Sequence, residues 1–291
     1  MCGPAEPLSA RPNVVRRAII WWFRAPNNPF VTVNFAVDAT ASRAYLRMLA
    51  AGGRRVTLTH LVAATIARTL TEHPYANGRV VGQRIVLLPN VGIAMPVNLL
   101  GSDGLDRELS MASVENVDGM TLAALANATT KRTGAEREGK PAHPLIKSLI
   151  AAGEALPHSL FRVFLRGFDT AANMSHVGDR VFRAAGVTTA LSNVGSTIKG
   201  VDGVLFRGAD VQPPSRLLQV GTFWGTSTIQ DEVIPIGGTP TIRPMLPVLF
   251  LFDHRLLDGV RGSRMIQSFC TAMLDPEAAF GAGGERLIGR G

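Results

Sequence analysis

The chain has 291 residues, 46% of them hydrophobic, and a formal net charge of +8 that comes almost entirely from arginine. This composition suits one large core, while two cysteines and six histidines without metal-ligand spacing indicate neither a disulfide framework nor a metal site. Aromatic residues make up only 6%, so we expect no nucleic-acid partner, and the phosphates of a small molecule suit the charge equally well.

The organisation of the chain predicts a single domain. Residues 1–13 and 281–291 are expected to be flexible tails around a domain at 14–280, because no Pro- or Ser-rich stretch divides it. The first nine residues lack the basic start and apolar core of a signal peptide, and no apolar run approaches the ~20 residues of a transmembrane segment. We therefore expect a cytoplasmic protein.

The first half of the chain predicts alternating helices and strands. In order, these are a helix near 16–23, a strand over 31–37, helices over 40–51 and 57–73, strands over 79–88 and 91–97, and a helix over about 120–138. Thr40 is expected to cap the second helix, and either Thr57 or Thr59 the third. His73 ends that third helix and is interpreted as a helix C-terminal cation rather than a catalytic group.

The segment 141–186 contains an apolar run with two arginines, Leu160–Arg166. Two interpretations are open: an amphipathic helix on a membrane surface or a partner, and a helix that covers the core. The pattern favours the second.

Two short motifs follow predicted strands in the last third of the chain. Residues 187–191 predict a strand that leads into Ser192-Asn193-Val194-Gly195, which by itself is ordinary turn chemistry. The apolar run 245–252, preceded by Pro244, predicts a buried strand that leads into Asp253-His254-Arg255-Leu256-Leu257-Asp258-Gly259. A helix begins after Asp258 and stops at 275–276, which places Asp258 at its N-cap and His254 at the exit of the strand. A histidine so placed suits proton transfer, although a structural histidine beside an ordinary cap has the same pattern.

The pattern Asp-His-Arg-x-x-Asp-Gly over residues 253–259 resembles the active-site motif of the acyltransferase components of 2-oxoacid dehydrogenase complexes. Residues 192–195 resemble that family's second motif, and 70–77 resemble its Leu…His-Pro…Asn helix end. The resemblance covers roughly 14–135 and 187–280. It implies a chloramphenicol acetyltransferase-like fold, an α/β two-layer sandwich with a mixed sheet covered by helices. The divergent segment 141–186 is expected to reshape one mouth of the substrate channel.

The resemblance also implies direct transfer of an acyl group between a coenzyme A thioester and an acceptor. His254 would act as general base, Ser192 would donate a hydrogen bond to the oxyanion, and Asp258 would hold the histidine loop by pairing with an arginine. That arginine would be Arg17 or Arg24.

Further roles follow from the same resemblance. Arg255 is expected to pair within the structure, and Asn193 and Gly195 are expected to contact the coenzyme A substrate. No metal and no tightly bound cofactor are expected. A homotrimer is expected, with larger assembly left open, and with the serine and histidine of each site supplied by adjacent protomers.

The acceptor remains open at this point. Only about a dozen residues precede the predicted domain, so we expect no tethered lipoyl arm. The favoured hypothesis is a free-standing acyltransferase that uses acyl-coenzyme A. The alternatives are a dehydrogenase-complex acyltransferase served by lipoyl domains of another chain, and a non-catalytic trimeric scaffold with the same fold.

Overall fold

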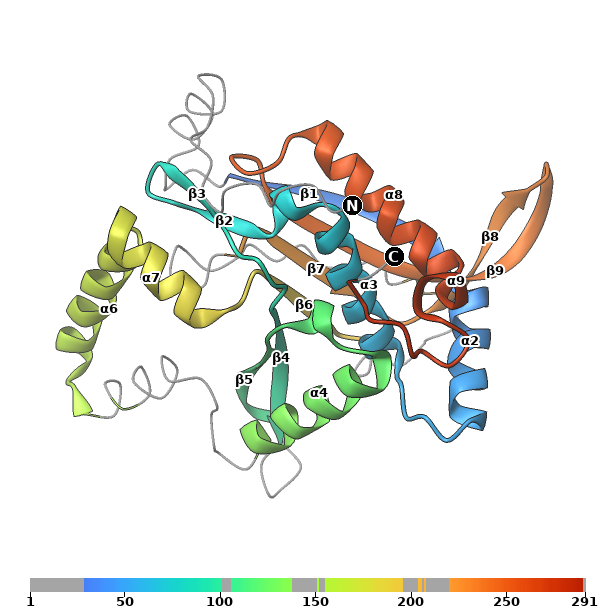
Figure 1. The fold of residues 1–291 in the computed structure, drawn as a ribbon, viewed down its shortest axis with the longest axis horizontal. Coiled ribbons are helices and arrows are strands. Elements are labelled where there is room, and N and C mark those ends of the chain that lie inside the picture. The colour runs from blue at the N-terminus through green and yellow to red at the C-terminus, as the bar shows by residue number, and fades with distance from the viewer. Residues whose placement is uncertain are drawn as a thin grey trace.

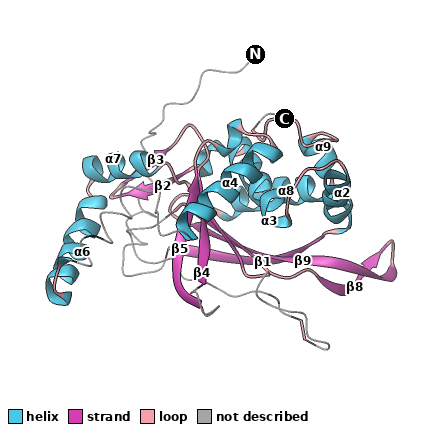
Figure 2. Ribbon diagram, turned by 90° about the horizontal axis from the view of Figure 1, so that it is seen from below, coloured by secondary structure: helices cyan, strands magenta, loops and turns pink. Residues whose placement is uncertain are grey.

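A mixed β-sheet with helices on one face forms the body of the protein (Figures 1 and 2). The computed structural model describes residues 29–100, 106–137, 151, 155–195, 204–205, 207 and 220–289. The sheet has the order β1-β9-β7-β6-β4-β5, with β8 paired to β9. Its strands are β1 (Phe30–Asp38), β4 (Ile93–Leu100), β5 (Asp106–Val114), β6 (Thr189–Asn193), β7 (Thr222–Thr226), β8 (Gln230–Ile236) and β9 (Thr239–Asp253).

The helical layer lies on one side of this sheet, as Figure 2 shows. It consists of α2 (Thr40–Ala51), α3 (Leu58–Glu72), α4 (Leu122–Arg137), α8 (Gly259–Leu274) and α9 (Pro276–Phe280). A two-stranded sheet, β2 (Gly78–Val81) and β3 (Arg84–Leu87), and the short 3₁₀ helices Pro74–Ala76 and Val117–Gly119 complete the body. The predicted two-layer α/β sandwich is therefore confirmed.

The long strand β9 pairs with three other strands of the sheet. Its first half pairs with β8, and its second half lies between β1 and β7, so that residues 245–253 are all buried. Trp224 of β7 stacks between Phe250 of β9 and Phe269 of α8, with ring centroids 4.2 and 4.8 Å away. The predicted strand at 245–252 is thus correct, but Pro244 does not begin it. Strand β9 already starts at Thr239, and its residues 239–245, with Pro240 and Pro244 among them, pair with β8.

Local hydrogen bonds decide two of the predicted helix starts. Thr57, not Thr59, caps α3: its backbone N–H donates to His60 Nδ1 at 3.2 Å and its hydroxyl accepts from the His60 backbone N–H at 3.4 Å. The prediction that Thr40 is a cap is wrong, because Ala39 occupies the N-cap and Thr40 is the first helical residue. The Asp38 carboxylate accepts from the Thr40 backbone N–H instead.

The C-terminal boundary predicted at residue 280 is too early. Ile288 is fully buried, and its backbone N–H donates to the Met120 carbonyl at 2.9 Å. The Tyr45 hydroxyl donates to the Gly281 carbonyl at 2.7 Å. Residues 281–289 therefore pack against the helical layer instead of forming a tail, while the predicted helix near 16–23 lies outside the described residues.

Two helices stand apart from this body at one edge, α6 (His158–Ala172) and α7 (Ser175–Ala185), as Figure 1 shows. Phe182 of α7 is buried with Val81 and Val86 of the two-stranded sheet, which attaches the pair to the body. Val163 of α6 is 66% exposed, so the interpretation that this helix covers the core is wrong. Within the described part of the chain, no helix is both long and apolar enough to cross a bilayer.

Candidate active site

The loop that follows β9 is fixed by an ion pair between Asp253 and Arg255, which are separated by one residue in the sequence. Asp253 is 1% exposed, and its carboxylate faces the Arg255 guanidinium with Nε to Oδ1 at 3.0 Å and Nη2 to Oδ2 at 2.7 Å. The Asp253 backbone carbonyl accepts hydrogen bonds from Leu256 and Leu257, both of which are buried. The prediction that Arg255 pairs within the structure is confirmed, and the chain turns tightly at this point.

His254 lies between the two partners of that ion pair in sequence. Its backbone N–H donates to the Pro29 carbonyl at 2.8 Å, which ties the loop to the start of β1. The imidazole is half-buried, with its ring centroid 6.3 Å from that of Phe252. Because the backbone on both sides is hydrogen-bonded, the ring is held at the exit of a rigid core strand, as the sequence predicts.

Asp258 is the N-cap of α8, as predicted. Its backbone is extended, and its carboxylate accepts from the Arg261 backbone N–H at 2.9 Å. The cap fixes the helix start four residues after His254. The two arginines predicted to pair with Asp258, Arg17 and Arg24, lie outside the described residues.

The second motif ends β6, which runs two residues further than predicted and includes Ser192 and Asn193. The Asn193 side chain donates to Thr59 Oγ1 at 2.8 Å and accepts from the Gly195 backbone N–H at 2.8 Å. A Cβ at Gly195 would lie 2.7 Å from the Ser227 carbonyl carbon, so only glycine fits this close approach. The turn that follows Ser192 is therefore held in place by these contacts, and the contact of Asn193 and Gly195 with coenzyme A remains a prediction.

Sheet register separates the two motifs within one chain. Ser192 pairs with Gly225 of β7, and Gly225 pairs with Leu249 of β9. His254 lies five residues beyond Leu249, which corresponds to about 16 Å along the strand. Ser192 and His254 therefore lie toward opposite ends of the strands, measured along the strand direction. A single chain does not bring the two side chains together.

A buried arginine behind the histidine loop is a feature that the sequence did not indicate. Arg79 of β2 is 4% exposed, and burial together with the nearby Arg255 lowers its pKa to about 10. Its guanidinium donates to the Ala172 carbonyl at the end of α6 at 3.4 Å and lies over the Phe182 ring, 5.5 Å from the centroid. It thus links β2 to the α6–α7 pair, and no sequence pattern marks it.

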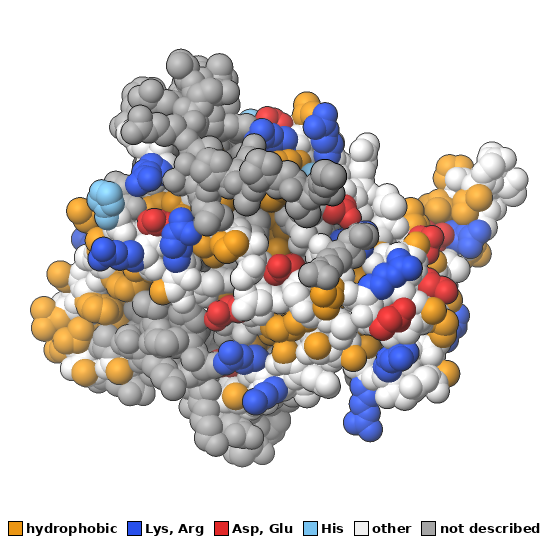
Figure 3. Space-filling view, in the orientation of Figure 1, with side chains coloured by type: hydrophobic (Ala, Val, Ile, Leu, Met, Phe, Trp, Pro, Cys, Tyr) orange, Lys and Arg blue, Asp and Glu red, His pale blue; other side chains and the backbone are white. Residues whose placement is uncertain are grey.

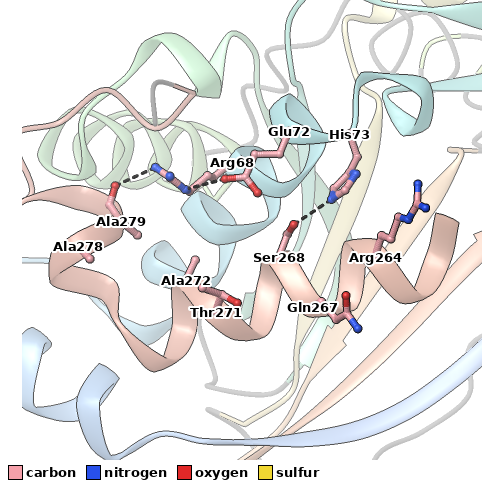
Figure 4. A pocket seen from close by; sticks show the side chains of 10 residues that line it. All are labelled: Arg68, Glu72, His73, Arg264, Gln267, Ser268, Thr271, Ala272, Ala278 and Ala279. Carbon is pink, nitrogen blue, oxygen red and sulfur yellow. Dashed lines mark hydrogen bonds and ion pairs between the residues drawn. The ribbon is translucent and has the colours of Figure 1, made fainter. Parts of the chain in front are cut away.

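A cavity of about 430 Å³ lies elsewhere, between α3, α8 and α9 (Figure 4). His73 Nε2 lies 2.9 Å from Ser268 Oγ, and its Nδ1 lies 2.8 Å from the Tyr75 hydroxyl. His73 is the C-cap of α3, at the helix end where the sequence places it, and burial lowers its pKa below the ordinary value, which disfavours the cationic form. The ring joins α3 to α8, and neither His254 nor Ser192 lines the cavity.

No group of three His, Cys, Asp or Glu side chains among the described residues is placed to hold a metal ion. The polar groups of the two motifs instead suit chemistry by proton transfer and hydrogen bonding.

Comparison with known proteins finds a family match over part of the chain. The model of the 2-oxoacid dehydrogenases acyltransferase (catalytic domain) matches residues 13–144. The acetyltransferase component of the acetoin cleaving system of Bacillus subtilis is 23% identical over 226 residues, which is 78% of this chain and 43% of that protein. The mitochondrial succinyltransferase component of the 2-oxoglutarate dehydrogenase complex of Sus scrofa is 34% identical over 77 residues, which is 26% of this chain and 16% of that protein. The chain thus spans less than half the length of these relatives.

Solved structures share the fold. The dihydrolipoamide acetyltransferase of Azotobacter vinelandii has a TM-score of 0.59 at 20% identity, covering 91% of this chain and 87% of that one. A chloramphenicol acetyltransferase has a TM-score of 0.50 at 14% identity, covering 91% of this chain and 99% of that one. Residues 13–144 therefore match the family model of 2-oxoacid dehydrogenase acyltransferase catalytic domains, and the chain as a whole has a chloramphenicol acetyltransferase-like fold.

Proposed function

We propose that this protein is an acyltransferase that moves an acyl group between coenzyme A and an acceptor, with His254 as general base. The observation that carries the proposal is the loop 253–258, in which an ion pair, a helix cap and a hydrogen bond to Pro29 hold one imidazole at the end of the buried strand β9. Fixed geometry is the first requirement for a general base. The family of residues 13–144 supports the class of reaction.

The reaction needs one proton acceptor and one hydrogen-bond donor. The neutral His254 imidazole accepts the proton of the acceptor thiol, hydroxyl or amine as that atom attacks the thioester carbonyl carbon. The carbonyl oxygen then carries negative charge, which the Ser192 hydroxyl stabilises by donating a hydrogen bond. When the tetrahedral intermediate collapses, the carbon–sulfur bond breaks, and the imidazolium returns its proton to the leaving coenzyme A sulfur.

The positions of the two motifs support an active site shared between copies of the chain. Ser192 and His254 lie toward opposite ends of the sheet in one chain, so the hydroxyl and the imidazole of one site come from different protomers. A closed ring of three identical subunits provides three such sites. A structure of the cubic core of the pyruvate dehydrogenase multienzyme complex has a TM-score of 0.58 with this chain, which supports self-assembly of this chain.

Asp258 is assigned a positioning role in this mechanism. Its cap bond fixes the start of α8 and therefore the loop that carries the imidazole. The study of the Azotobacter structure concerned a serine, a histidine and an asparagine four residues after that histidine in the catalytic mechanism of that protein. Asp258 follows His254 by the same four residues.

Asn193 and Gly195 are proposed to place the substrate. Their mutual hydrogen bond keeps the turn after Ser192 rigid, so the backbone there offers a fixed surface to the coenzyme A arm of the substrate. No tightly bound cofactor takes part, and we propose a cytoplasmic location.

The acceptor separates two versions of this function. The names of the relatives, which act on dihydrolipoyllysine residues, favour a lipoyl domain supplied by another chain. A small thiol, hydroxyl or amine acceptor is the other version. A trimeric scaffold without activity is the remaining alternative, and the rigidly held histidine argues against it because a scaffold has no need of one.

The test measures release of free coenzyme A from acetyl- and succinyl-coenzyme A, with either a purified lipoyl domain or a set of small acceptors. His254→Ala is expected to lower the rate by about 10²–10⁴-fold, and Ser192→Ala by about 10²–10³-fold. His176→Ala, an exposed histidine of α7, is the matched control and should keep the parent rate. Equal rates for His254→Ala and the parent would exclude the proposed chemistry, and no release with any acceptor would favour the scaffold.

A further inference from the structure

The helix α6 carries an apolar face that the rest of the protein leaves exposed. Leu160, Val163 and Phe164 are 55%, 66% and 36% exposed and, at helical spacing, lie on one side. The Phe164 ring also stacks with those of Phe161 and Phe168, with centroids 6.3 Å apart in each pair. Figure 3 shows hydrophobic side chains gathered at the edge of the molecule where α6 lies. A contiguous exposed patch of this kind marks an interaction surface.

The same face continues onto the start of α7. Met174 is 58% exposed and Val177 is 43% exposed, and Arg180 follows at the same spacing of three residues. The patch therefore consists of five large apolar side chains from two adjoining helices, with a basic residue at its end.

Basic side chains border the patch along α6 as well. Arg162 and Arg166 are exposed and lie one turn apart on the polar side of the helix, with Arg166 three residues after Val163. The one acidic residue of α6, Asp169, is half-buried. We propose that α6 and the start of α7 dock this protein onto an anionic lipid surface, with the apolar side chains among the acyl chains and the arginines at the headgroups.

Length and charge favour a lipid surface over a second copy of the chain. α6 has 15 residues, fewer than the ~20 that span a bilayer, so it suits a position parallel to the membrane plane. In a two-fold contact of α6 with itself, the arginines of both copies would face each other, and like charges repel.

Vesicle flotation of the full-length protein tests this proposal. We expect binding to vesicles of phosphatidylcholine mixed with phosphatidylglycerol, little binding to phosphatidylcholine alone, and weaker binding at high salt. The double variant Val163→Asp/Phe164→Asp should lower partitioning at least about tenfold, because two apolar side chains that would enter the lipid become charged. The matched control, Val233→Asp/Ile242→Asp, changes two residues of the β8–β9 hairpin that are 67% and 68% exposed, and it should bind as the parent does.

A second variant leaves the apolar residues in place. Arg162→Gln/Arg166→Gln should lower partitioning into the anionic vesicles by about 25-fold, since each arginine near such a surface contributes on the order of fivefold. Thermal unfolding of every variant establishes that it is folded. Failure of the parent to float with anionic vesicles would overturn the proposal, as would an equal loss in the hairpin control. A change of sedimentation coefficient on Val163→Asp/Phe164→Asp, without vesicle binding by the parent, would assign the patch to a protein contact instead.

Discussion

The side chains of Asp253 and Arg255 form a two-pronged ion pair on either side of His254 in the sequence, and the carboxylate of this pair is almost completely buried. Removal of the guanidinium therefore leaves a buried charge with its strongest partner missing. The same pair sets the path of the backbone that carries the imidazole, so stability and activity depend on it together.

Arg255→Met is expected to lower the free energy of unfolding by about 3–5 kcal/mol, as is typical when one partner of a buried ion pair is removed. Urea unfolding followed by circular dichroism measures this loss. Arg243→Met is the control, since Arg243 pairs with Asp38 at 3.8 Å with both side chains partly exposed. A loss of about 1 kcal/mol or less is expected there. Equal losses in the two variants would contradict the importance of the Asp253–Arg255 pair.

Gly195→Ala is expected to disturb the turn that follows Ser192 at the end of β6. The new Cβ would lie 2.7 Å from the Ser227 carbonyl carbon, so the backbone of one of the two segments must shift. We expect a lower kcat, because the serine hydroxyl moves relative to the reacting carbonyl, together with a destabilisation of about 1–3 kcal/mol.

Gly134→Ala is the matched control for this substitution. Gly134 lies inside α4, and a Cβ there meets nothing within 4 Å. Alanine in a helix interior is more favourable than glycine by about 1 kcal/mol. This variant should therefore unfold at a higher urea concentration than the parent and keep the parent kcat. An unchanged kcat in Gly195→Ala would show that the turn has no influence on the reaction.

The sequence predicts those parts of the fold that neighbouring residues decide. The apolar run that forms β9 and the cap at Asp258 are local features, and both appear where the pattern places them. Long-range contacts decide the rest. The position of α6 depends on whether another surface covers it, and the protonation of His73 depends on burial between α3 and α8.

The candidate site also divides into features that local sequence predicts and features that long-range contacts decide. The sequence indicates the residues of the two motifs, because each motif follows a strand. Their separation follows from strand register, which pairs Ser192 with Gly225 and Gly225 with Leu249. The buried Arg79 was missed because its position in a β-rich run carries no local mark of burial.

His60 makes the start of α3 sensitive to acid. Its Nδ1 accepts from the Thr57 backbone N–H, and this requires an unprotonated nitrogen. Burial lowers the pKa of His60 in the folded state below its ordinary value of 6.5. The unfolded chain therefore binds the proton more readily, and this contribution to stability is present above about pH 6.5 and falls as the pH drops below it.

His60→Gln should reduce this pH dependence. Glutamine at the third helical position completes a capping box without titrating. Urea midpoints measured at several pH values should fall less steeply between about pH 6.5 and 5 than those of the parent. His176→Gln changes an exposed histidine of α7 and should leave the pH dependence as it is. An identical acid dependence in His60→Gln and the parent would contradict this assignment.

A shared active site has a consequence that a site within one chain lacks. If Ser192 of one protomer works with His254 of another, two inactive variants complement each other when they assemble together. In trimers formed at random from equal amounts of Ser192→Ala and His254→Ala chains, each site has an intact pair in about a quarter of cases. Co-expression with two different affinity tags, followed by sequential purification, isolates the mixed trimers.

The expected result is recovery of activity to about a third of the parent rate in the purified mixed trimers, because one of the three sites in each has an intact pair, while each variant alone stays inactive. Mixing the two purified homotrimers without exchange of subunits should give no recovery, which controls for contamination. A site built within one chain always contains one of the two substitutions, so co-assembled trimers would then remain inactive. That outcome would contradict the shared site, although His254 would keep its role as general base, because the single substitutions test that role separately.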